Sequence, residues 1–297
     1  MKGRFENVYL CHSGIVLKGL KIVKNSIFDN VQSSSFYLYA IFKLITEKKK
    51  WFAKGNYLII HNHWSSGYHH WLTESLVRLT KVTSSEFTLI IPEDYPSFSK
   101  QSLELFDFEN IIYLKPKTGV FVATLTVPEN PISGYYKKSD LLTVKDVIFT
   151  KWSLSHSILD KKIYVSRENA NLRLIENEEE VIEYLTSAGF LVVRAESLSF
   201  KEQVTLFSSC KLFVSIHGAA LTNCLFMAKN TNLLELYRQP LNENDSMNNC
   251  YERMTHALGI NHQYLLCETG ENLGKHIDKT NLKVDLKMFK KTIETYI

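Results

Sequence analysis

The sequence predicts an α/β protein, in which short apolar strands alternate with amphipathic helices. Two observations carry this prediction. The second half of the chain alternates strand and helix from residue 162 onward. Residues 212–223, L-F-V-S-I-H-G-A-A-L-T-N, pass from a β-branched strand through small residues into an apolar stretch with helical spacing. With 297 residues the chain is long enough for two domains.

In the second half, the strands are predicted at residues 162–166, 190–194, 212–216, 232–237 and 263–267. The helices are predicted at residues 177–188, 199–209, 247–258 and 286–296, and from Leu221 onward. Asn177 precedes an acidic first turn, Ser199 and Glu202 form a capping box, and Gly259 ends a helix. Strands that alternate with helices in this way predict a parallel sheet, so we expect a Rossmann-like domain over residues 146–297.

The first half is less regular. Strands are predicted at residues 8–10, 15–17, 57–60, 87–92, 111–114 and 123–127, and helices at 69–80 and 99–106. Residues 139–152 are expected to bridge to the second half. Residues 35–45 fit either a strand or a helix, and Lys48–Lys50 are predicted as a solvated turn. The alternation again favours a parallel sheet, in a first domain over residues 1–145. The last helix of the chain could pack back on this first domain.

Composition excludes several classes. The net charge of +4 does not argue for nucleic acid, although it would not oppose an anionic ligand or an anionic membrane face. The five cysteines are scattered and lack a C-x-x-C pair, which favours buried free thiols in a reducing compartment. No signal-peptide core is apparent, and no apolar run reaches the ~20 residues of a membrane span.

The turn after residues 212–216 is a candidate ligand site. His217 ends a predicted strand, where open α/β sheets bind ligands, and Gly218 and Ala219 lead into a helix N-terminus whose free N–H groups attract anions. The alternative is a packed turn with a core histidine. The sequence has no G-x-G-x-x-G after its first strand, no P-loop and no G-x-S-x-G elbow, so dinucleotide oxidoreductases and P-loop enzymes are disfavoured.

A second candidate site is a cluster of histidines in the first half: His61, His63, His69 and His70. On the predicted helix, His70 and Glu74 are four residues apart and share a face. A histidine and a carboxylate there could act as base and orienter, could bind a metal with a second histidine, or could form a plain surface pair. The pattern H-H-W-x-x-E is not the H-E-x-x-H zinc signature.

Together these regions resemble glycosyltransferase family 61. G-Y-H-H-W-L-T-E-S-L-V-R-L at residues 67–79 is similar to the family's N-domain motif. The similar segments of the second half, in order, are Y-V-S-R (164–167), Arg173, N-E (177–178), A-G-F (188–190), L-S-F-K-E-Q (198–203), H-G-A-A-L-T-N (217–223) and L-L-E-L (233–236). The chain departs from the family pattern at Val77, at Ala220 and at residues 228–230.

The resemblance implies a GT-B architecture, with two Rossmann-like domains facing a cleft, and transfer of a sugar from a nucleotide sugar with inversion. It implies a glycan or lipid-linked glycan acceptor and no nucleic acid. Because the sequence shows no signal anchor, the chain looks more like the bacterial members of the family, which are associated with the synthesis of capsular or other surface polysaccharides. We therefore expect a cytoplasmic protein that could associate peripherally with the inner face of the membrane.

In such a transfer, charge grows on the leaving phosphate and must be stabilised. The chain has no D-x-D motif to hold a cation there, so we expect no metal or cofactor and assign this role to Arg167 and Arg173. We expect the phosphates to bind the N–H groups of Gly218, Ala219, Ala220 and Leu221. The His217 side chain could donate to a phosphate as well. For Glu235 two roles are open: it accepts hydrogen bonds from the ribose hydroxyls, or it is a buried carboxylate that caps neighbouring groups. Asn223 makes a donor contact or a helix-end bond.

The base should come from the acceptor side, where His70 and Glu74 are the candidates. His70 has a pKa suited to proton transfer at neutral pH, and Glu74 could orient it or act itself. Two other functions stay open. One is a metal-dependent hydrolase that uses His61, His63, His69, His70 and Glu74, and the other is a non-catalytic carbohydrate-binding relative.

Overall fold

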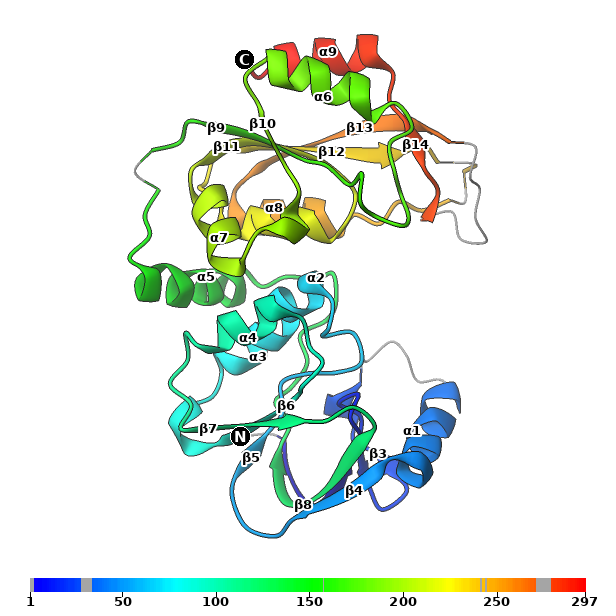
Figure 1. The fold of residues 1–297 in the computed structure, drawn as a ribbon, viewed down its shortest axis with the longest axis vertical. Helices are drawn as coiled ribbons and strands as arrows, with labels where there is room; N and C mark the ends of the chain where they lie inside the picture. Colours follow the sequence, from blue (N-terminus) through cyan, green and yellow to red (C-terminus); the bar gives the residue numbers. More distant parts are fainter. Residues whose placement is uncertain (1–2, 28–33, 157, 241, 244, 271–278) are drawn as a thin grey trace. The chain divides into compact units, whose positions relative to one another are not determined.

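The computed structural model describes residues 3–27, 34–156, 158–240, 242–243, 245–270 and 279–297. The chain forms two compact units, Met1–Lys151 and Trp152–Ile297. Each unit contains one sheet in which parallel strands are prominent, accompanied by helices (Figure 1). The protein is therefore of the α/β class, as the sequence predicted.

The second unit holds an open sheet in the order β10-β9-β11-β12-β13-β14. Its strands are β9 (Lys161–Val165), β10 (Leu191–Val193), β11 (Cys210–Ile216), β12 (Asn232–Arg238), β13 (Asn261–Thr269) and β14 (Leu282–Lys283). The first five pair in parallel, and β14 is antiparallel to β13. Counted from β9, the parallel order is 2-1-3-4-5, a doubly wound arrangement that binds ligands where strands 1 and 3 meet. That place lies at the carboxyl ends of β9 and β11.

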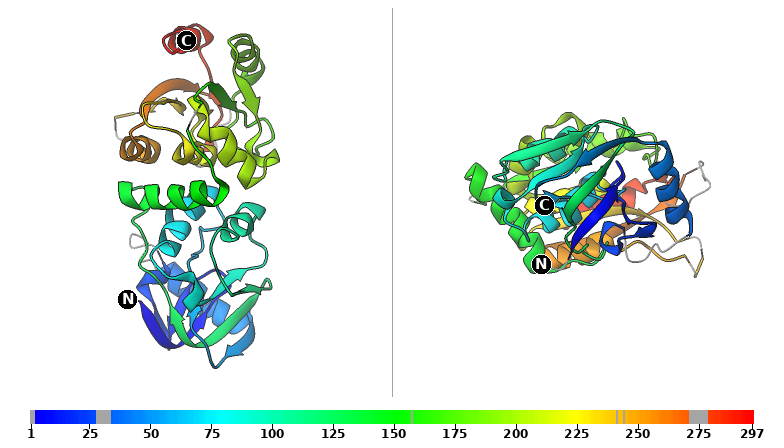
Figure 2. Two further views of the ribbon diagram at one scale, coloured as in Figure 1. Left: turned by 90° about the vertical axis from the view of Figure 1, so that its left-hand side faces the viewer. Right: turned by 90° about the horizontal axis from the view of Figure 1, so that it is seen from below.

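Helices cover both faces of this sheet (Figures 1 and 2). On one face lie α6 (Glu178–Ser187) and α9 (Leu286–Glu294), and on the other lie α7 (Phe200–Ser208) and α8 (Cys250–Leu258). The capping box of Ser199 and Glu202 is confirmed. Asn177 does not cap α6 with its side chain, which instead bonds both the N–H and the carbonyl of Val284, at 3.0 and 2.9 Å. Within this unit α9 packs beside α6 in the core.

The predicted helix after His217 is instead η5 (Ala219–Phe226), a 3-10 helix. The Asn223 side chain explains part of the difference. Its Nδ2 donates to the Ala220 carbonyl at 3.1 Å, and a side chain that occupies a backbone acceptor competes with regular helix formation. Residues 221–226 are all buried, so packing on every side holds the tighter turn in place.

The first unit has a mixed sheet in the order β3-β2-β1-β8-β5-β6-β7, with β4 also paired to β8. Its strands are β1 (Arg4–Leu10), β2 (Val16–Lys18), β3 (Lys21–Ile22), β4 (Lys48–Phe52), β5 (Tyr57–Leu58), β6 (Thr88–Pro92), β7 (Asn110–Leu114) and β8 (Thr118–Thr126). Strands β4 to β8 pair in parallel, but β1 to β3 are antiparallel. The expectation of a parallel sheet thus fits only part of this unit.

The prediction of a turn at Lys48–Lys50 is wrong, because these residues open β4. Lysines are common on edge strands, where their charge discourages pairing with another chain. The open choice for residues 35–45 is settled as a helix, α1 (Ser34–Thr46). The other helices described in this unit are η1 (Lys24–Ser26), α2 (Tyr68–His70), η2 (Trp71–Ser75), α3 (Leu76–Leu79), η3 (Ser84–Glu86), α4 (Ser97–Leu103) and α5 (Lys138–Trp152).

The predicted helix over residues 69–80 is present as α2, η2 and α3 in direct succession, and η2 is a π-helical turn. All five cysteines lie in described parts of the chain, and they are buried and unpaired, as predicted. In the described part of the chain, none of the helices has both the length and the apolar character that crossing a bilayer requires.

Candidate functional site

The turn after β11 offers backbone donors that have no partner among the described residues. The His217 N–H bonds the Leu236 carbonyl at 3.0 Å and so still belongs to the sheet. The Leu221 N–H bonds the Gly218 carbonyl at 2.9 Å and closes the first turn of η5. The N–H groups of Ala219 and Ala220 precede that bond and take no part in the helix ladder. The predicted phosphate contact of Leu221 is therefore not supported, because its N–H is already used.

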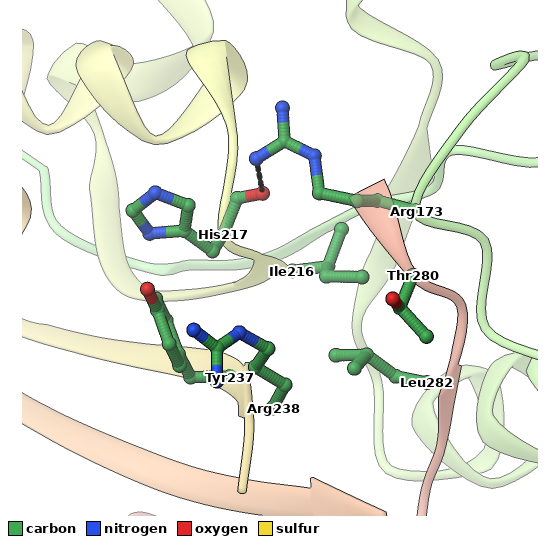
Figure 3. A pocket seen from close by; sticks show the side chains of 7 residues that line it. All are labelled: Arg173, Ile216, His217, Tyr237, Arg238, Thr280 and Leu282. Atoms are coloured by element: carbon green, nitrogen blue, oxygen red, sulfur yellow. Dashed lines mark hydrogen bonds between the residues drawn. The ribbon is translucent and has the colours of Figure 1, made fainter. Parts of the chain in front are cut away.

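Two arginines lie against this turn. Arg167 follows β9, and a Cβ atom built on Gly218 would be 2.6 Å from Arg167 Nη1. The Arg173 Nη1 donates to the His217 carbonyl at 2.9 Å (Figure 3). Burial, together with the nearby charge of Arg173, lowers the pKa of Arg167. Two cations placed this close repel each other, so a bound anion would relieve the repulsion.

A third arginine, Arg238, was not predicted. It ends β12 and lines a small pocket at the carboxyl ends of β11 and β12 (Figure 3). The lining residues are Arg173, Ile216, His217, Tyr237, Arg238, Thr280 and Leu282. Arg238 pairs with Asp245, its Nη2 lying 2.7 Å from Oδ1 and its Nη1 contacting Oδ2. The sequence signal for it was its position, at the end of the strand beside His217.

Thr280 contributes a buried hydroxyl group to the wall of this pocket. Its side chain is buried, and within the described parts of the chain its Oγ1 has no hydrogen-bond partner. The hydroxyl faces the pocket lined by Arg173 and Arg238 (Figure 3). Because an unpaired buried hydroxyl is costly, a ligand oxygen or a water is expected beside it.

His217 is held by a buried carboxylate. Its Nδ1 contacts Glu235 Oε1, while Glu235 Oε2 is 2.8 Å from Nε2 of His262. The Glu235 side chain is completely buried, so the geometry favours the buried-carboxylate alternative over a ribose contact. The His217 ring also packs against Tyr237 and Tyr251, at centroid distances of 4.8 and 5.3 Å. With Nδ1 occupied, Nε2 is the nitrogen that remains for a ligand.

Asn223 faces the protein interior. Its Nδ2 donates to Gln203 Oε1 and to the Ala220 carbonyl, both at 3.1 Å, and its side chain is fully buried. Gln203 in turn donates to the carbonyls of Ala195 and Leu198. These bonds join η5 to α7, so the helix-end alternative for Asn223 fits the geometry and a donor contact does not.

In the first unit, His70 and Glu74 form the expected pair. Nδ1 of His70 is 2.8 Å from Oε1 of Glu74. The His70 side chain is 26% exposed and that of Glu74 only 2%, so the histidine is the member that reaches the surface. The Trp64 ring lies 5.1 Å from the His70 ring. The pair spans the π-helical turn, and such turns are frequent at functional sites.

The other histidines of the cluster have separate environments. Burial lowers the pKa of His61 to about 3 and that of His63 to about 4, and His69 Nε2 lies 3.0 Å from the Tyr136 hydroxyl. No three His, Cys, Asp or Glu side chains of the described residues are grouped so that they could hold a metal ion. The geometry therefore gives no support to the metal-dependent hydrolase.

A doubly wound sheet that carries cations and free N–H groups at its switch point is typical of proteins that bind phosphate-bearing ligands. The comparisons with known proteins specify the class. A family model described as Glycosyltransferase 61 matches residues 68–234, more than half of the chain. The chain therefore belongs to this family, which confirms the resemblance seen in the sequence. The match includes both the His70–Glu74 helix and the His217 turn.

The EGF domain-specific O-linked N-acetylglucosamine transferase of Xenopus laevis is similar to part of the chain. The two are 28% identical over an alignment of 163 residues, which covers 48% of this chain and 30% of the relative. The matched segment is thus less than a third of the relative's length. The matching family model and the relative both carry the description of a glycosyltransferase.

Proposed function

We propose that the protein transfers a sugar from a nucleoside diphosphate donor to a hydroxyl of a glycan, with inversion at the anomeric carbon. The observation that carries the proposal is the contact of Arg167 and Arg173 with the turn at His217 and Gly218. It puts two positive charges beside the N–H groups of Ala219 and Ala220, which lie ahead of the first η5 hydrogen bond, and charge of this sign stabilises a leaving diphosphate.

On the donor side, each group has a separate role. Arg167 and Arg173 neutralise the phosphates, and the two N–H groups bind phosphate oxygens. Glu235 fixes the ring of His217 so that Nε2 can donate to the same ligand. Thr280, with its unpaired hydroxyl in the described structure, offers one further bond from the pocket wall. These groups need no cation to hold the diphosphate, which supports a metal-independent reaction.

On the acceptor side, we propose His70 as the base that takes the proton from the attacking hydroxyl. Glu74 is nearly buried, so it acts by orienting His70 and stabilising its charged form rather than by meeting the acceptor itself. Donor and base then come from different halves of the chain, in keeping with a GT-B architecture. The acceptor proposed from the family resemblance is a capsular or other surface polysaccharide, built on a lipid or free glycan in the cytoplasm.

A screen of nucleotide sugars by thermal shift tests the proposal, since a ligand that binds only the folded state raises its stability. Nucleotide-linked N-acetylglucosamine comes first, because the Xenopus relative is named for that sugar. We expect at least one donor to raise the midpoint of the wild type and to lose this effect in Arg167→Ala. If no donor or diphosphate shifts the midpoint, the proposal fails. Binding without turnover on any acceptor would favour the non-catalytic alternative.

A further inference from the structure

The helix α1 has a stripe of apolar side chains that are exposed to solvent. Leu38, Phe42 and Ile45 follow each other at spacings of four and three residues, so they share one face. Their exposures are 66%, 59% and 72%. The opposite face is already buried, with Ala40 in a core cluster of the first unit. A contiguous apolar stripe on the outside of a folded domain usually marks a binding surface.

Trp51 extends this stripe from the neighbouring strand β4. It is 73% exposed and stacks on Phe121 at a centroid distance of 4.1 Å. Phe121 also packs against Tyr9, whose hydroxyl is 2.9 Å from Glu47 just after α1. Trp51 and α1 therefore lie on the same face of the sheet, and Figure 1 shows β4 beginning close to the end of α1.

Positive charge surrounds the stripe. Residues 34–54 contain the lysines Lys43, Lys48, Lys49, Lys50 and Lys54 and one carboxylate, Glu47. Glu47 is buried and bonded to Tyr9 and to the His12 N–H, so it does not offset the lysines at the surface. The Lys49 Nζ donates to the Ile45 carbonyl at 2.9 Å, which holds one of these charges beside the apolar stripe.

We propose that α1 and β4 bind the surface of an anionic membrane, through Leu38, Phe42, Ile45 and Trp51 with their neighbouring lysines. Apolar side chains enter the boundary between headgroups and acyl chains, tryptophan favours that boundary, and lysines attract anionic headgroups. Protection of an edge strand would explain Lys48–Lys50 but not the stripe on α1. A second copy of the chain is a poorer partner, because a symmetric contact would bring lysines against lysines.

Sedimentation with lipid vesicles tests this surface without any sugar donor, so its outcome is independent of the proposed transfer. The probes are vesicles of phosphatidylcholine alone and vesicles that also contain phosphatidylglycerol. We expect binding to the anionic vesicles only, weakening as salt is added. The variant Leu38→Ser/Phe42→Ser/Ile45→Ser should bind at least ~10-fold more weakly. Lys49→Gln, which removes the lysine held beside Ile45 on the same face as Trp51, should lose roughly fivefold at low salt, which corresponds to ~1 kcal/mol.

The matched control is Ile132→Ser/Ile158→Ser/Met288→Ser, which removes three exposed apolar side chains elsewhere and should bind like the wild type. Equal binding of control and α1 variants, or no binding by the wild type, overturns the proposal. So does a wild-type dimer that the α1 variant dissociates, since a second copy would then cover the stripe. If the triple variant unfolds, the single change Ile45→Ser, at the most exposed apolar position of α1, gives the same comparison.

Discussion

The guanidinium of Arg167 occupies the space that Gly218 leaves open. A Cβ on residue 218 would stand 2.6 Å from Arg167 Nη1, closer than such atoms can approach. The φ of Gly218 is 169°, an extended value that any residue can adopt. An alanine at this position would therefore be accepted by the backbone but would force the Arg167 guanidinium to move.

Gly218→Ala should consequently act like Arg167→Ala. The added methyl displaces the guanidinium, and each variant is expected to weaken binding of the bare nucleoside diphosphate by roughly 1.5–3 kcal/mol, as for a hydrogen bond to a charged group. Calorimetry measures this without knowledge of the sugar. In the double variant the losses should not add, because both remove the same contact. Tight binding by Gly218→Ala would show that Arg167 does not hold the phosphate.

Substitutions at His70 and Glu74 should affect turnover and not donor binding. We expect His70→Ala and Glu74→Gln to lower the transfer rate at least ~100-fold, within the range of general base catalysis. His69→Ala is the matched control, since its Nε2 faces Tyr136 instead, and should stay much closer to wild type. Near-normal rates in both test variants would put the base elsewhere. If the variants fail to fold, the pair of His70 and Glu74 has a structural role only.

Glu235→Gln should weaken donor binding although Glu235 cannot touch the donor. The amide would no longer accept from both His217 and His262, and His217 would lose its fixed orientation. The expected loss of affinity is roughly tenfold. His262→Ala should act in the same direction, while Thr231→Val, which removes a buried bond at the opposite end of β12, should leave affinity unchanged. Unaltered affinity in both test variants would contradict the positioning role.

Stability should fall in mild acid because of His61. Its pKa is about 3 in the folded protein and about 6.5 when unfolded, so between these values the unfolded chain binds one more proton. The free energy of unfolding then decreases by ~1.4 kcal/mol for each pH unit below about 6.5. His63 acts in the same direction. Urea unfolding between pH 6.5 and 4.5 should show a smaller slope in His61→Leu and an unchanged slope in the exposed control His256→Asn.

Transfer is expected to survive an excess of chelator, because the arginines and N–H groups at the His217 turn supply the positive charge that a cation would otherwise provide. The measurement compares rates before and after exhaustive chelation. Strict dependence on magnesium or manganese would count against the roles of Arg167 and Arg173.

The sequence indicated the second unit better than the first. Its strands are flanked by caps and stops, such as Ser199 with Glu202, that act locally and can be seen in the letters alone. The strand at Lys48–Lys50 was missed because its pairing with β8 is a long-range contact that no local pattern records. The 3-10 form of η5 likewise depends on Asn223, whose bond to Gln203 crosses between two helices.

Some residues of the candidate site could likewise be predicted from the sequence, and others could not. His217, Arg167 and the pair of His70 with Glu74 could be found from strand ends and helical spacing. Arg238 and Thr280 could not, since Arg238 reaches the pocket through the pairing of β12 with β11, and Thr280 through the segment that leads into β14. The burial of Glu235 between two histidines also depends on the neighbouring strand β13, which carries His262.

The contact of Trp64 with His70 has an optical consequence. All four tryptophans lie at or before residue 152, so the pocket lined by Tyr237 has none of its own. A protonated imidazole quenches the emission of an indole that touches it, and Trp64 is 42% exposed beside His70. Intrinsic fluorescence should therefore report the protonation of His70, and a glycan that settles over that ring, more directly than a nucleotide held at His217.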